Sequence, residues 1–141
     1  MSTVVTPKLG LAYDPDWADP TNPNWPKLDG LVLDWSAVLS PAALAADQND
    51  YNPGGLAAAN VLRLSASVAV NISGLQSGAA GRLVAVHNVG ANHITLRDED
   101  AGSAAANRLA LPANLVLIPD SGCFLEYDVT SARWRVPGGT G

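Results

Sequence analysis

Short apolar runs separated by turn residues fill the sequence from residue 60 to residue 136 and constrain the fold more than any other feature. Runs such as Asn60–Leu64 and Gly81–Asn88 contain five to eight residues, and Gly, Pro, Asn or Ser residues separate them. Runs of this length are too short for a helical domain and are typical of β-strands joined by tight turns. The sequence therefore predicts an all-β domain.

The expected strands number about eight, and the alternation of side chains supports them. Ile94 and Leu96 fall on one face of their run, whereas Thr95 falls on the other. No helical pattern separates the strands, so a parallel sheet is not expected. The sequence instead predicts an antiparallel β-sandwich or barrel. The expected strands are residues 60–64, 68–72, 81–88, 92–97, 107–111, 114–118, 122–127 and 132–136.

The first 41 residues differ in composition from the rest of the chain. They contain six of the ten prolines and three of the four tryptophans. Proline at this density prevents a continuous helix, which predicts an extended arm over residues 1–41, a β-domain over residues 42–136 and a flexible tail over residues 137–141. A disordered linker normally lacks aromatic residues, so this arm is expected to dock. The candidate interface anchors are Tyr13, Trp17, Trp25, Trp35 and Trp134.

The sequence leaves open what the arm contacts: its own domain, a neighbouring copy or a different protein. An arm of about forty residues is long for a body of about 100 residues to absorb, which favours docking between subunits or onto a partner. Trp134, between two arginines, is expected to face either the core or a subunit interface. A short helix is expected at Pro41–Ala46, with Ser40 as its cap.

Charge and hydropathy narrow the expected partners. The chain has 8 Lys and Arg residues against 13 Asp and Glu residues, a net charge of -5, and no basic cluster for phosphates. We therefore expect no nucleic-acid partner. No apolar stretch reaches the roughly 18 residues of a membrane span, so no membrane partner is expected. The start of the chain lacks a secretory signal pattern, which predicts a soluble protein made in the cytoplasm.

Residue types that carry chemistry are present, but their spacing does not favour catalysis. Cys123 has no second cysteine for an intrachain disulfide and is expected to be a small buried apolar residue. His87 and His93 are too few for a metal site. Glu126 and Asp128 lie two residues apart on one expected strand, where a solvated face is favoured over a glycosidase pair. Without a nucleophile elbow or a phosphate loop, we expect no enzymatic activity, cofactor or metal.

Short polar and apolar elements recur in a consistent order over about ninety residues, from residue 47 to residue 136. They are Gln48–Pro53, Asn71–Leu75, Gly81–Arg82, Asn88–Gly90, Ile94–Leu96, Ala106–Arg108 and Tyr127–Arg135. Together they resemble a β-domain found in virion proteins of tailed bacteriophages. The resemblance implies a jelly-roll-like module that is commonly trimeric and has no catalytic residues.

The resemblance and the arm together predict a non-enzymatic virion protein. The leading expectation is a homotrimeric capsid decoration (cement) protein that binds the major capsid protein and stabilises the outer surface of the shell. The acidic net charge suits a position away from packaged DNA. One alternative is a tail or fibre component that docks through its N-terminal arm. Another is a carbohydrate-binding module at the host surface.

Overall fold

The computed structural model describes residues 35–138, which form strands, turns and loops with only two single-turn 3-10 helices, η1 (Leu56–Ala58) and η2 (Ala105–Asn107). The prediction of an all-β domain is therefore confirmed. The strands are β1 (Val38–Leu39), β2 (Val61–Leu64), β3 (Val70–Ile72), β4 (Leu83–Asn88), β5 (Ile94–Leu96), β6 (Leu115–Leu117), β7 (Ser121–Asp128) and β8 (Arg133–Arg135).

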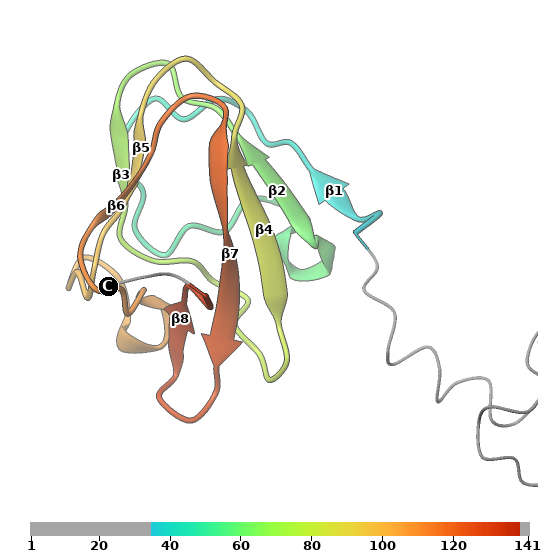
Figure 1. The fold of residues 1–141 in the computed structure, drawn as a ribbon, viewed down its shortest axis with the longest axis vertical. Coiled ribbons are helices and arrows are strands. Elements are labelled where there is room, and N and C mark those ends of the chain that lie inside the picture. Colours follow the sequence, from blue (N-terminus) through green and yellow to red (C-terminus); the bar gives the residue numbers. More distant parts are fainter. Residues whose placement is uncertain (1–34, 139–141) are drawn as a thin grey trace, which may run out of the picture. The chain divides into compact units, whose positions relative to one another are not determined.

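The strands form two sheets (Figure 1). The larger sheet has the order β1-β2-β4-β7-β8, and the smaller has the order β3-β5-β6. Leu62, Val86 and Leu125 from the larger sheet join Ile72 and Leu96 from the smaller one in a single cluster of buried apolar side chains. One hydrophobic core therefore holds both sheets together.

Both sheets are mixed, so the prediction of antiparallel pairing throughout is wrong. β1 with β2, β2 with β4, and β3 with β5 are parallel pairs. The pairs β4 with β7, β5 with β6, and β7 with β8 are antiparallel. Parallel neighbours need a long crossover connection, usually a helix. Here the crossover from β2 to β4 runs through β3 of the other sheet, so parallel strands form without any helix.

This crossover gives the chain a repeating winding. Val61 pairs with Ala85 in the larger sheet and Val70 pairs with Ile94 in the smaller one, an offset of 24 residues in both. The isolated bridge between Gln48 and Ile72 carries the same offset back to the preceding turn. Successive turns therefore place equivalent residues side by side.

Two local predictions are wrong. No helix forms at Pro41–Ala46; instead Leu44 is buried, and its N–H donates to Ser65 O at 2.8 Å. A six-residue helix is marginal alone, so burial of Leu44 decides the local conformation. No strand forms over residues 107–111, where η2 is followed by isolated bridges at Arg108 and Leu109.

The described residues belong to a compact unit that begins at Trp35. Residues 35–41, the last part of the predicted arm, lie in this unit, and β1 pairs there with β2. Residues 1–34 and 139–141, the remainder of the predicted arm and most of the predicted tail, lie outside the described residues.

Candidate functional site

The face of the larger sheet that points away from the core carries an apolar row. Pairing aligns Val38 with Val61, Val61 with Ala85, and Ala85 with Phe124 across four neighbouring strands. Paired residues project on the same side of a sheet. Phe124 and Val38 are 52% and 53% exposed, whereas Val61 and Ala85 between them are buried. An apolar row that is exposed at its two ends and covered in the middle therefore crosses this outer face, with an aromatic residue at one end.

Trp35 packs on this surface. Its ring centroid lies 5.7 Å from that of Phe124, with the planes tilted by 51°. This separation is within the range of favourable aromatic pairs. Trp35, one of the predicted anchors, therefore lies on the outer face of the larger sheet. It is also the first of the described residues.

A hollow of about 480 Å³ lies beside Phe124 on the same face. Gly122 lines it, and a Cβ at this position would come within 2.4 Å of the Val86 carbonyl oxygen on β4. Only glycine therefore fits this position of β7 without moving β4. The lining residues are Ala85, His87, Asn88, Val89 and Asp120–Phe124.

Polar side chains surround the hollow without filling it. His87 and Asp120 line it and are exposed, and Arg63 pairs with His87 across β2 and β4, so it lies in the same row. Within residues 35–138, the side chains of Arg63 and Asp120 make no hydrogen bond or ion pair. By contrast, the Asn88 amide is fully buried and donates to Leu117 O at 2.8 Å. Asp120 in the lining, and Arg63 outside it in the same row, thus keep hydrogen-bonding capacity for a partner.

Trp134, also a candidate anchor, is a core residue. Its side chain is fully buried, its Nε1–H donates to Leu75 O at 2.6 Å, and Tyr127 meets it edge-on at 5.3 Å. Of the two positions that the sequence left open, the structure shows the core. The other candidate anchors, Tyr13, Trp17 and Trp25, lie outside the described residues.

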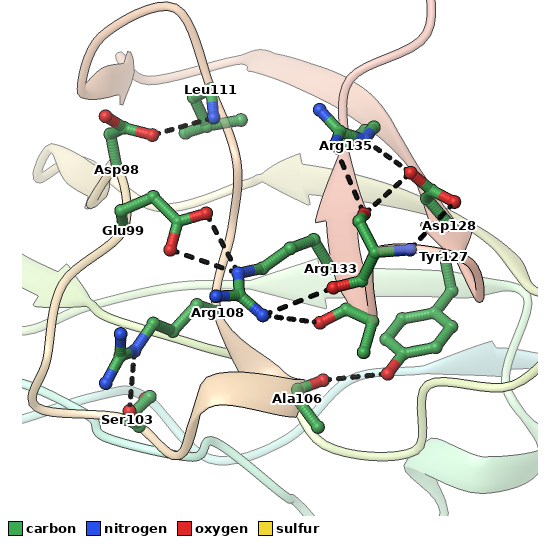
Figure 2. Close-up of polar contacts among 12 residues, drawn as sticks. Asp98, Glu99, Ser103, Ala106, Arg108, Leu111, Tyr127, Asp128, Arg133 and Arg135 are labelled. Carbon is green, nitrogen blue, oxygen red and sulfur yellow. Dashed lines mark hydrogen bonds and ion pairs between the residues drawn. The ribbon is translucent and has the colours of Figure 1, made fainter.

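A second polar region lies around β8 and the loop before η2 (Figure 2). Arg133 Nε donates to Glu99 Oε1 at 2.9 Å, and Arg135 Nε donates to Asp128 Oδ2 at 2.8 Å. Arg108 Nε donates to the backbone of the same loop. These groups are satisfied by one another or by backbone, so the region ties loops to the sheet rather than presenting free groups to a ligand.

Two buried serine hydroxyls form a pair that the sequence did not predict. Ser73 Oγ and Ser103 Oγ are 2.7 Å apart, and both residues are buried. Asp50 connects to this pair, since its N–H donates to Ser103 Oγ and its Oδ1 accepts from Asn107 Nδ2. The hydrogen bond from Asn107 is the main reason that the pKa of Asp50 lies below its usual value. Short polar residues in turns resemble ordinary turn residues, so no sequence signal marks this network.

The residues considered for catalysis or metal binding are separate in the fold. His87 lies on β4 of the larger sheet, while His93 precedes β5 of the smaller one. Within residues 35–138, no group of three or more His, Cys, Asp and Glu side chains is arranged to hold a metal ion. Burial raises the pKa of the Cys123 thiol to about 11, which disfavours the reactive thiolate.

Sequence reasoning missed Phe124 and Gly122 as surface residues. Along β7, Cys123 and Leu125 face the core and Phe124 faces outward, but both sets contain apolar residues. The one signal in the sequence was that Glu126, a charged residue, lies two positions after Phe124 and therefore on the same face of the strand.

Comparison with known proteins adds no relative: no family model, curated protein or solved structure matches this chain. Among the described residues, no helix has the length and apolar character needed to cross a membrane.

Proposed function

We propose that this chain is a non-enzymatic structural protein of a bacteriophage virion, and specifically a homotrimeric capsid decoration protein that binds the major capsid protein on the outer surface of the shell. One observation carries the proposal. The apolar row from Val38 to Phe124 is exposed at both ends, and Trp35 packs on its Phe124 end.

Such a row supports an assembly role for a physical reason. Large apolar side chains that stay exposed on a folded domain, as Val38 and Phe124 do, can mark a protein-binding site. Aromatic side chains supply much of the binding energy of protein interfaces. The proposal includes a jelly-roll-like sandwich, since the two sheets share one core and the larger sheet turns its other face outward.

Copy number in purified virions tests the location. Quantitative mass spectrometry against the major capsid protein should find this chain in the same order of abundance, as expected for decoration of a whole lattice. A few copies per particle would favour a tail or fibre component instead. Absence from the particles would refute both.

Particle binding by variants tests the surface. Phe124→Asp places a charge in the apolar row and should abolish retention on capsids and the resistance to heat that the protein confers. Val129→Asp is the matched control, because Val129 is 59% exposed but lies in the turn between β7 and β8. Equal binding by both variants would show that the row is not the assembly surface.

A carbohydrate-binding role is the second candidate, and the hollow is the observation that favours it. An aromatic pair, Trp35 and Phe124, stands beside a recess with free polar side chains at His87 and Asp120. Binding pockets commonly combine apolar walls with a few polar groups. A glycan array probed with the full chain should then give signals that Phe124→Asp removes, and no signal on the array would exclude this candidate.

A further inference from the structure

The outward side of β7 carries acidic groups beside an exposed aromatic ring. Gly122, Phe124 and Glu126 are exposed and alternate with residues that face the core. Asp120 comes just before the strand and lines the hollow together with Gly122 and Phe124. Within residues 35–138, the side chains of Asp120 and Glu126 make no hydrogen bond or ion pair. The hollow therefore combines an unpaired carboxylate with an aromatic wall.

Asp120 has a backbone that is tied to the sheet. Its N–H donates to Asn88 O at 3.0 Å, at the end of the neighbouring strand β4. Its φ is 61°, in the left-handed region that Asp and Asn enter more readily than most other residues. The carboxylate is thus exposed and unpaired on a backbone that is already placed, which lowers the entropy cost of binding a partner there.

The other charged groups nearby do not neutralise this carboxylate. Besides Asp120, the lining contains one histidine, His87, and no arginine or lysine. Arg63 pairs in register with His87 but lies on β2, outside the lining. Arg135 on β8 donates to Asp128. The lining of the hollow is therefore acidic.

These groups select among possible occupants. A purely apolar occupant would cover the Asp120 carboxylate without giving it a partner, which is costly. An acidic occupant would be repelled by the same group. A basic side chain pairs with the carboxylate through charge-assisted hydrogen bonds, its charged head is attracted to an aromatic face, and its apolar stem can lie on a ring. Only the basic side chain satisfies both Asp120 and Phe124.

We infer that the hollow binds an arginine or lysine side chain of the protein onto which this chain docks, with the charged head at Asp120 and the stem against Phe124. The volume of about 480 Å³ admits such a side chain with its flanking backbone. Glu126 extends the negative charge along the same side of β7. The inference rests on the proposed function, because it names the chemistry that the major capsid protein presents to this face.

An NMR titration of the full chain tests the inference with a defined probe, the tripeptide acetyl-Gly-Arg-Gly-amide. The peptide should shift the backbone amide resonances of the lining residues saturably. The matched control is the same peptide with citrulline, which keeps the shape of arginine without its charge, and which should bind at least about threefold more weakly. Equal affinity for the two peptides, or no saturable shift with the arginine peptide, would overturn the inference.

Variants of the lining show whether the probe binds at the hollow. Asp120→Asn removes the charge and keeps a residue that tolerates the left-handed backbone, so it should fold and raise the dissociation constant of the arginine peptide at least about threefold. Phe124→Leu removes the ring but keeps an apolar side chain, and should raise the constant by about two- to fivefold. Unfolding midpoints of each variant exclude misfolding as the cause.

Asp100→Asn is the control for net charge. It removes the same charge from the loop between β5 and η2, outside the lining, and should change the constant by less than about twofold because exposed charges are screened. An effect as large as that of Asp120→Asn would mean that net charge attracts the peptide, and the inference would be wrong.

The inference and the proposed function fail separately. Absence of the wild-type protein from virions refutes the proposed function, whereas the peptide titration does not depend on virions. Presence in virions without binding of the arginine peptide refutes the inference alone. Retention of Asp120→Asn on capsids at the wild-type level would likewise show that docking does not use this contact.

Discussion

Trp134 stabilises the fold through burial and a hydrogen bond together. Its side chain is fully buried and contacts Tyr127, whose hydroxyl donates to Ala106 O at 3.0 Å (Figure 2). The indole N–H donates to Leu75 O, so its polar atom is satisfied inside the core. The two aromatic residues therefore connect β7 and β8 to η2 and to the segment after β3.

Asp128 should make stability depend on acid pH. Hydrogen bonds from Ser131 and Arg135 lower its pKa from 3.8 to about 2. A carboxyl with a lowered folded-state pKa contributes stability above its unfolded value and loses it as pH falls toward the folded value. Asp128→Asn should therefore be less stable than wild type at pH 7, and the difference should disappear between about pH 4 and pH 2.

Urea unfolding at a series of pH values measures this difference. Asp120→Asn is the control, because the Asp120 side chain has no such partners within residues 35–138. It should follow wild type across the range. A constant gap between wild type and Asp128→Asn down to pH 2 would contradict the account.

At the scale of elements, β4 and β7 form the centre of the larger sheet and need close backbone contact. Gly122 pairs with His87, and a Cβ there would meet Val86 O at 2.4 Å and His87 Cδ2 at 3.2 Å. No flexible side chain can move to relieve the closer contact. The glycine therefore determines the spacing of this pair.

Gly122→Ala should lower the free energy of unfolding by about 1–3 kcal/mol, the usual range for forced overpacking. Gly54→Ala is the matched control, since a Cβ there meets nothing within 4 Å and the residue does not have a positive φ. Denaturant unfolding measures both. A loss for Gly122→Ala no greater than that for Gly54→Ala would mean that the strands shift apart at little cost.

The 3-10 helix η1 is held by the side chain of one arginine, Arg82. Arg82 donates from its guanidinium to the carbonyl oxygens of Leu56, Ala57 and Ala59, the last at 2.8 Å. These carbonyls belong to η1 and its C-cap. Burial lowers the pKa of Arg82 below its usual value, but an arginine stays charged at that level. One side chain therefore joins the start of β4 to the turn before β2.

For the whole molecule, the segment between β1 and β2 is part of the core. Leu44 and Tyr51 are 6% and 7% exposed and belong to the same apolar cluster as the strands of both sheets. They come from the turn that precedes β2 and bridge to residues one winding later. The body therefore depends on the segment that contains Leu44 and Tyr51.

Two truncations test this dependence. A chain of residues 35–141 should unfold cooperatively with a thermal midpoint close to that of the full chain. A chain of residues 53–141 lacks Leu44 and Tyr51, each worth about 2–4 kcal/mol when buried, against a typical total of 5–15 kcal/mol. It should lose cooperative unfolding by calorimetry. Retained cooperativity would show that the first turn is dispensable.

Local chemistry determined the class of the fold. Period-two alternation at Ile94, Thr95 and Leu96, and turn residues at close intervals, were enough to predict strands and an all-β domain. Trp35 was also named from the sequence as an anchor, because an aromatic residue in a proline-rich segment is unusual.

Only the tertiary structure decided which strands are neighbours and which face of each strand is covered. β2 and β4 are parallel because the chain visits the other sheet between them, and pairing over 24 residues leaves little local trace. The hollow likewise lies where Gly122 of β7 pairs with His87 of β4. Strand formation follows from neighbouring residues, whereas pairing and surface shape follow from contacts between distant ones, which is why a single sequence determines the first and not the second.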